Sequence, residues 1–175
     1  MSRKFPRRGH ETGYIRLNRN FCFGCGQDNS QGMHLKFTYN EEGKSFVARF
    51  RLARRYTGPP GYAHGGIIAA ILDEAMGKPN RLRQVVAMTA EMTVQYLKPV
   101  PLGEPLIAEA RERRVRGRVY LREGEIRNRQ GAVLARAQGK FVAIDPHKMF
   151  AKHLQDTKGI PGTETRNRRA QRGKA

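Results

Sequence analysis

The stretch AHGGIIAAILDEAMG, residues 63–77, carries a glycine pair at its start and two carboxylates near its end. Its other residues are mostly apolar, and helices of this composition are usually buried. Burying an ionised carboxylate costs free energy unless it is paired or hydrogen-bonded. Asp73 and Glu74 therefore require either a structural partner or a chemical role.

The glycine turn that opens this stretch has the features of an oxyanion site. Glycine lets the backbone approach a ligand closely, and the free N–H groups and positive dipole end of a helix favour developing negative charge. Such donors suit the oxyanion that forms when a carbonyl is attacked. We expect the N–H groups of Gly65, Gly66 or Ile67 to serve this role, although the same glycines would also suit an ordinary tight turn. His64 either fixes the turn by hydrogen bonds, which we favour, or contacts substrate.

Asp73 lies too far along the helix to act beside its own glycine turn. It follows Gly66 by seven residues, which is about 10 Å along an α-helix. A reacting carbon must lie about 3 Å from both the donor and the attacking group. If both groups act on one substrate, they come from different chains, and a two-fold dimer with antiparallel helices would supply them.

The two carboxylates have different expected surroundings. Asp73 would act as a general base on water or as a nucleophile, and the alternative is a buried Asp satisfied by backbone groups or an arginine. Glu74 points about 100° away around the helix. We therefore expect Glu74 to face solvent or an arginine rather than the same substrate.

The surrounding pattern predicts one buried helix and a series of antiparallel strands. Period-2 alternation indicates the strands, while Gly77 and Pro79 end the helix. On the longest strand, alternation places Thr89, Glu91 and Thr93 on one face. The expected helix covers about 66–76, and the expected strands cover 33–40, 44–52, 84–100, 104–117, 118–129 and 132–145. This order favours an α+β architecture in which one curved sheet wraps the helix.

Three segments together resemble the hotdog-fold acyl-CoA thioesterases: GYAHGGIIAAILDEAMG, MTAEMTVQYLKPVPLGEPL and GAVLARAQGKFV. The branch most similar is that of the phenylacetate-pathway thioesterases, in which an HGG turn opens the central helix. The resemblance covers about 21–144, since CFGCGQDNSQGMHL is similar to the lead-in of one subgroup. It implies a hotdog fold with five to six strands and a homodimer, often assembled further into a homotetramer. It also implies hydrolysis of an acyl-CoA thioester without a metal or cofactor.

The resemblance also suggests roles for residues outside the helix. Thr89 falls where this family places a Ser or Thr hydroxyl, which would orient the attacking water or hydrogen-bond Asp73. Glu91 would share its face and line the substrate cavity. Arg81 and Arg83, with the basic stretch at 111–118, would supply cations for the phosphates of CoA, although a basic stretch also suits a solvated surface.

Composition sets the remaining expectations. The net charge of +19 favours polyanionic partners such as nucleic acid, an acidic membrane surface or CoA. We expect a basic, flexible arm over 1–20, one domain over 21–146, and a basic, disordered tail over 147–175. No stretch approaches the roughly 20 apolar residues of a membrane span, and no apolar signal region is recognised, so we expect a cytoplasmic protein.

The only two cysteines, Cys22 and Cys25, have the spacing of half a zinc site. His34 is the only histidine near them, and no second CxxC follows. We therefore expect no metal and interpret this segment as a closely packed loop at the substrate mouth, with a redox pair as an alternative.

Two other functions compete with hydrolysis. A hotdog dimer could bind acyl-CoA or act as a scaffold without catalysis, although a pure binder has no need for a desolvated Asp73. A nucleic-acid-binding protein would use the basic arm, the strand at 111–118 and the tail, although the sequence lacks an aromatic and basic platform motif.

Overall fold

The computed structural model describes residues 20–152. Of the basic arm predicted over 1–20, only residue 20 lies within this range. Of the disordered tail predicted over 147–175, residues 147–152 lie within it, and 147–149 are helical rather than disordered. The elements are, in chain order, β1 (Thr38–Asn40), β2 (Ser45–Phe50), the 3-10 helix η1 (Arg54–Tyr56), α1 (Gly65–Gly77), α2 (Asn80–Arg83), β3 (Ala87–Tyr96), β4 (Leu106–Arg116), β5 (Val119–Asn128), β6 (Val133–Ala143) and α3 (Pro146–Met149).

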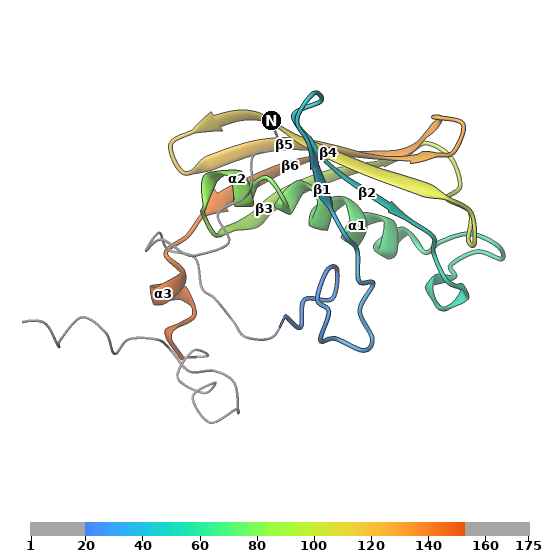
Figure 1. The fold of residues 1–175 in the computed structure, drawn as a ribbon, viewed down its shortest axis with the longest axis horizontal. Coiled ribbons are helices and arrows are strands. Elements are labelled where there is room, and N and C mark those ends of the chain that lie inside the picture. The colour runs from blue at the N-terminus through green and yellow to red at the C-terminus, as the bar shows by residue number, and fades with distance from the viewer. Residues whose placement is uncertain (1–19, 153–175) are drawn as a thin grey trace, which may run out of the picture.

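The six strands form one antiparallel sheet that curves over α1 (Figure 1). Their order across the sheet is β1-β2-β4-β5-β6-β3, so β3 is an edge strand that pairs only with β6. The helix packs on the concave face, where its side chains Ile71, Leu72 and Met76 are fully buried. This arrangement confirms the predicted α+β hotdog architecture of one central helix and one curved sheet.

Alternation along the strands decides which side chains meet the helix. In β5, the buried positions are Tyr120, Arg122, Gly124 and Ile126, and the residues between them are half-buried. Gly124 leaves room for Met76, because a Cβ at this glycine would lie 3.2 Å from the methionine Cγ. Small residues beneath the helix therefore let it approach the sheet closely.

One inward position of β5 is an arginine that supports the end of the helix. The Arg122 side chain is buried, and its Nη1 donates to the carbonyl of Met76 at 2.9 Å. A cation at the C-terminus of a helix interacts favourably with the helix dipole. The guanidinium also lies 4.8 Å from the ring centre of Phe141. Burial lowers the pKa of Arg122, while the nearby carboxylate of Glu112 opposes this effect.

Several boundaries differ from the prediction. The first strand begins at Thr38 rather than residue 33, because the backbone before it is hydrogen-bonded to the cysteine-containing loop. The N–H of Met33 donates to the Phe23 carbonyl, and that of Leu35 donates to the Gly24 carbonyl. The short helices η1, α2 and α3 were not predicted, and each has four residues or fewer. None of the helices within residues 20–152 is long and apolar enough to cross a membrane.

Candidate active site

The helix α1 starts at the glycine turn, and His64 caps it. His64 Nδ1 accepts a hydrogen bond from the Gly66 N–H at 3.0 Å, and the His64 carbonyl accepts from Ile67 at 2.9 Å. A side-chain acceptor at this position satisfies an N–H group that the helix itself leaves free. The favoured structural role of His64 therefore agrees with its position, and no contact with a substrate is needed to explain it.

This cap changes which donor is free at the turn. The expectation that Gly66 or Ile67 supplies the open N–H needs correction, because both groups already have acceptors within the turn. Within residues 20–152, no hydrogen bond uses the N–H of Gly65. The donor best placed for an incoming carbonyl oxygen is therefore that of Gly65.

A second side chain, which the sequence analysis missed, holds the other side of Gly65. The hydroxyl of Tyr96, at the end of β3, donates to the Gly65 carbonyl at 3.2 Å. Tyr96 is 55% exposed, so it lies at the surface rather than in the core. The sequence does not predict this contact, because Tyr96 and Gly65 are 31 residues apart and only the packing of β3 beside α1 brings them together.

Asp73 lies near the C-terminal end of α1 and accepts a hydrogen bond from Thr89, near the start of β3, whereas Tyr96 is at the end of that strand. The Thr89 hydroxyl donates to Asp73 Oδ1 at 2.6 Å, so the structure brings these two predicted residues together. The Asp73 side chain is half-buried. Thr89 thus occupies one carboxylate oxygen and orients the other.

A β-bulge in β3 separates Thr89 from Glu91, contrary to the prediction. Thr89 is paired with Phe141 and Glu91 with Lys140, so Ala90 is an extra residue between them. Directly opposed residues of an antiparallel pair point to the same face, and Phe141 is buried while Lys140 is exposed. Thr89 therefore faces the helix, whereas Glu91 faces the outer side of the sheet. The expectation that Glu91 lines the cavity with Thr89 is wrong.

Glu74 also departs from expectation, because it is half-buried and its ion-pair partner is a lysine rather than an arginine. Its carboxylate forms an ion pair with Lys78, one turn along, and accepts a hydrogen bond from Cys22 Sγ at 3.4 Å. Burial opposes ionisation, but the Lys78 ammonium and the hydrogen bonds from Cys25 and Cys22 lower the pKa of Glu74 overall. Burial and the neighbouring Glu74 raise the pKa of the Cys25 thiol.

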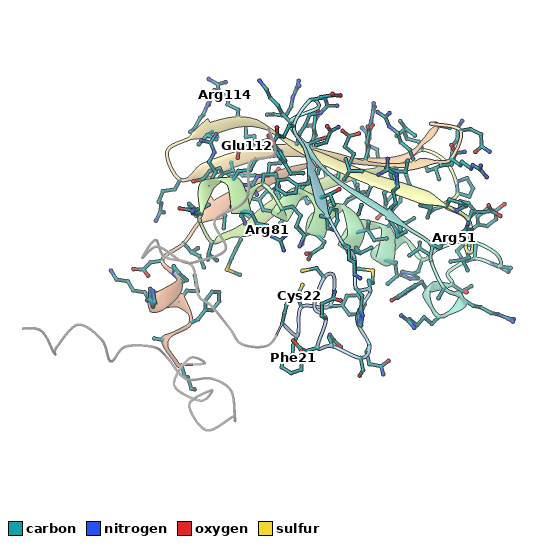
Figure 2. All side chains as sticks on the ribbon, in the orientation of Figure 1. Phe21, Cys22, Arg51, Arg81, Glu112 and Arg114 are labelled. Carbon is teal, nitrogen blue, oxygen red and sulfur yellow. The ribbon has the colours of Figure 1, made fainter. Side chains whose placement is uncertain are left out.

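The two arginines expected to bind phosphate differ in availability. Arg83 is held by Glu112 of β4, with Nη2 and Oε1 2.7 Å apart. Arg81 is exposed on α2 (Figure 2). Arg81 is therefore the less constrained cation of the two.

A hollow of 380 Å³ lies elsewhere, on the outer face of the sheet, and charged side chains such as Glu109, Arg111 and Arg136 line it. It contains neither Asp73 nor the glycine turn. The predicted chemistry thus lies on the helix side, away from this hollow.

Residues 60–135 match the sequence model of the thioesterase superfamily. The match includes the glycine turn, all of α1 and the edge strand β3. With the single helix wrapped by a six-stranded antiparallel sheet, the match shows that residues 60–135 are similar to this superfamily and that the described residues have its hotdog fold.

Individual relatives agree with this similarity. The chain is 30% identical over 132 residues to the acyl-coenzyme A thioesterase THEM4 of Xenopus laevis, covering 75% of this chain but only 59% of that protein. A crystal structure of a thioesterase superfamily protein is 31% identical, with a TM-score of 0.63 over 68% of this chain and 65% of that chain. The PaaI protein from the phenylacetic acid degradation operon of E. coli shares the fold at 23% identity, with a TM-score of 0.58 over 63% and 79% of the two chains.

Proposed function

We propose that this protein hydrolyses an acyl-CoA thioester to a carboxylic acid and CoA, in active sites shared between the two protomers of a homodimer. The substrate class is taken from the similarity to an acyl-coenzyme A thioesterase over 75% of the chain. The shared site is a separate inference, which rests on the placement of Asp73 and Gly65 in the fold.

One observation supports the proposal of a shared site: Asp73 and Gly65 are hydrogen-bonded to opposite ends of the same edge strand. Thr89, near the start of β3, bonds to Asp73, and Tyr96, at its end, bonds to Gly65. A two-fold axis through the middle of the free edge of β3 would exchange these ends. Asp73 of one protomer would then face Gly65 of the other, and the dimer would hold two equal sites.

The free edge of β3 is a suitable surface for this pairing. An unpaired edge leaves backbone N–H and C=O groups open to another strand. β3 has ten residues, most of them exposed, among them the large apolar side chains Met88 and Tyr96. Pairing two such edges would join the sheets of two protomers into one and cover these side chains. Further assembly into a tetramer remains a prediction from family resemblance.

In the proposed reaction, Asp73 acts on a water molecule and Gly65 on the carbonyl. The free oxygen of Asp73 accepts a proton as the water oxygen bonds to the thioester carbon. The Gly65 N–H of the partner protomer donates to the resulting oxyanion, where the helix dipole also favours negative charge. The C–S bond then breaks, and the CoA sulfur takes the proton from Asp73. In a nucleophilic variant, Asp73 would instead attack the acyl carbon, the C–S bond would break to release the CoA thiolate, and water would then hydrolyse the resulting anhydride to the carboxylic acid.

Thiol release from a panel of aliphatic and aromatic acyl-CoAs tests this function. We expect the wild type to hydrolyse at least one of them, and Asp73→Asn to lower kcat by about 10²–10⁴-fold, the usual contribution of a general base. Glu104→Gln, at an exposed acid outside the site, is the matched control and should retain activity. Unchanged turnover in Asp73→Asn would exclude the assignment of the base. Binding of CoA without hydrolysis of any substrate would instead favour a non-catalytic acyl-CoA-binding protein.

Nucleic-acid binding through the basic surface is the second candidate. It would fall steeply with salt and survive Asp73→Asn. The stretch at 111–118 is partly neutralised, because Arg111 and Arg113 both pair with Glu123, at 2.9 and 3.2 Å. This pairing favours the thioesterase proposal. Cytoplasmic location stays a prediction of the sequence.

A further inference from the structure

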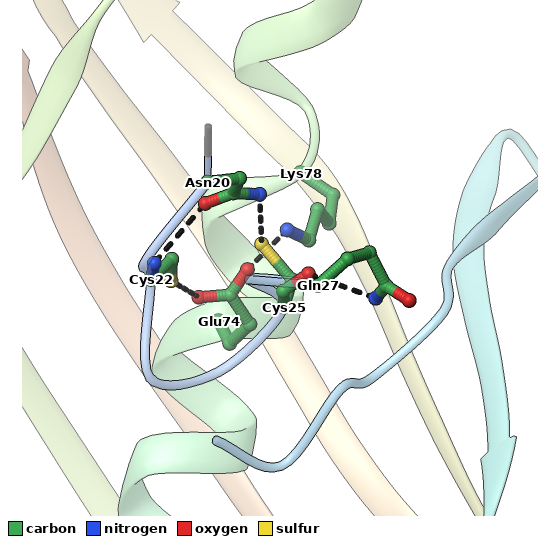
Figure 3. Close-up of polar contacts among 6 residues, drawn as sticks. All are labelled: Asn20, Cys22, Cys25, Gln27, Glu74 and Lys78. Atoms are coloured by element: carbon green, nitrogen blue, oxygen red, sulfur yellow. Dashed lines mark hydrogen bonds and ion pairs between the residues drawn. The ribbon is translucent and has the colours of Figure 1, made fainter. Parts of the chain in front are cut away.

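The loop before β1 lies on the side of α1 that faces away from the sheet (Figure 1), and it brings two thiols close to a carboxylate of the helix (Figure 3). Cys22 and Cys25 belong to the loop before β1, and Glu74 belongs to the helix, 52 residues after Cys22. The two sulfur atoms and a carboxylate oxygen all lie within 4.8 Å of one another. The third member of the cluster is thus a residue that the spacing of the cysteines alone does not reveal.

The separations within this cluster are close to those of a tetrahedral zinc site. Zinc–sulfur bonds of about 2.3 Å and zinc–oxygen bonds of about 2.0 Å place neighbouring S and O ligands about 3.5 Å apart. Cys22 Sγ and Glu74 Oε2 are 3.4 Å apart. Cys22 and Glu74 therefore need little movement to share one ion, and Cys25 Sγ lies within 4.8 Å of the other two ligand atoms.

The backbone of the loop is shaped to present the cysteines in this way. The Gly26 N–H donates to the Cys22 carbonyl at 2.8 Å and closes a tight turn around the CxxC segment. A Cβ at Gly26 would lie 2.4 Å from the Asn20 carbonyl oxygen, so only glycine fits. A Cβ at Gly24 would lie 2.6 Å from Glu74 Oε2. Both glycines therefore permit a close approach of the loop to the carboxylate.

The charges of the three ligands and of Lys78 would together balance the charge of a divalent ion. Two thiolates and one carboxylate carry three negative charges, and a divalent cation leaves one of them uncompensated. Lys78 lies beside the cluster and pairs with Oε1 of Glu74, the oxygen that does not face Cys22 (Figure 3). Partners of this kind, outside the ligand set, orient a metal-binding carboxylate.

We propose that Cys22, Cys25 and Glu74 bind one Zn²⁺ ion, which fastens the loop before β1 to the central helix. Binding displaces one proton from each thiol, and a water molecule takes the fourth position. Soft thiolates with a carboxylate suit zinc rather than magnesium or calcium. His34 does not belong to the group of close ligand atoms, and its Nε2 is hydrogen-bonded to the Asn29 carbonyl. The inference is independent of thioester hydrolysis.

The test measures metal in the full chain, purified with a non-thiol reductant and without chelator. We expect about one zinc ion per chain, the content of a single site with three protein ligands and one water. After exchange for Co²⁺, thiolate-to-cobalt charge transfer should absorb in the near ultraviolet, together with visible bands of tetrahedral Co²⁺. Cys22→Ser should halve the charge-transfer intensity or abolish binding, and Glu74→Gln should weaken zinc retention against a competing chelator by at least tenfold.

Asp73→Asn provides the matched control, because it removes the adjacent acid of the same helix but none of the three ligands. It should keep full metal content and the cobalt spectrum of the wild type. Circular dichroism of each variant checks that loss of metal is not loss of fold. Absence of zinc and of a cobalt band in the reduced wild type would overturn the proposal. Retention of zinc by Glu74→Gln at wild-type affinity would overturn it as well.

Discussion

At the scale of single residues, the free N–H at the start of α1 belongs to Gly65, which makes a specific test of the oxyanion site possible. Proline is tolerated at the first position of a helix, where the missing N–H has no acceptor within the helix. The preceding His64 has ψ of 138°, an extended conformation that residues before proline adopt readily. Gly65→Pro thus removes the donor while preserving the helix.

We expect Gly65→Pro to lower kcat by about 10²–10³-fold, the usual effect of losing one oxyanion donor. Gly65→Ala is the matched control, since it keeps the N–H, and its Cβ would lie at an ordinary 3.7 Å from the Tyr96 ring. Thiol-release kinetics and thermal unfolding of both variants give the result. Wild-type turnover in Gly65→Pro would remove this donor from the mechanism.

Residue chemistry was predictable where neighbours in the sequence determine it. The acids at 73 and 74 were expected to have different surroundings because they lie on different faces of one helix, and they do. Their partners were less accessible to prediction. The hydrogen bond from Thr89 to Asp73 was one of two roles left open for Thr89. The thiol partners of Glu74 lie 49 and 52 residues before it in the sequence.

At the scale of elements, the stability of α1 depends on its His64 cap. The imidazole Nδ1 accepts from Gly66 and leaves Gly65 as the free donor. Asparagine is also a strong N-cap residue, whereas alanine has no acceptor. We expect His64→Ala to lower the free energy of unfolding by about 0.5–2 kcal/mol and His64→Asn to recover most of this loss, as measured by urea denaturation. Equal stability of all three proteins would show that the cap contributes nothing.

The strand β3 shows where pattern reasoning failed. Strict alternation assigns Thr89 and Glu91 to one face, but the extra residue Ala90 shifts the register against β6. A bulge of this kind reverses the side to which later residues point. No glycine or proline marks it in the sequence, so only the pairing with β6 reveals it.

At the scale of the whole molecule, the proposed dimer predicts rescue between two defective chains. Asp73→Asn retains the Gly65 donor, and Gly65→Pro retains the carboxylate. A dimer of one chain of each kind would contain one intact site and one doubly defective site. Random mixing makes about half of the dimers mixed, so activity should recover to about one quarter of the wild-type value.

The two variants are co-refolded at equal concentration, and thiol release is compared with that of each variant refolded alone. Two different affinity tags isolate the mixed dimer and confirm its composition. Activity no greater than the mean of the separate variants would mean that each site lies within one chain, or that the chains do not pair as proposed.

The sequence by itself determined the local geometry of the central helix and the class of fold around it. The 3.6-residue turn and 1.5 Å rise separate Asp73 from the glycine turn, whatever the rest of the chain does, and period-2 alternation indicates the strands. Tertiary structure alone decided the order of the strands, the bulge that turns Thr89 toward Asp73, and the meeting of Cys22 and Cys25 with Glu74. These features depend on contacts between residues far apart in the chain, which a local pattern does not specify.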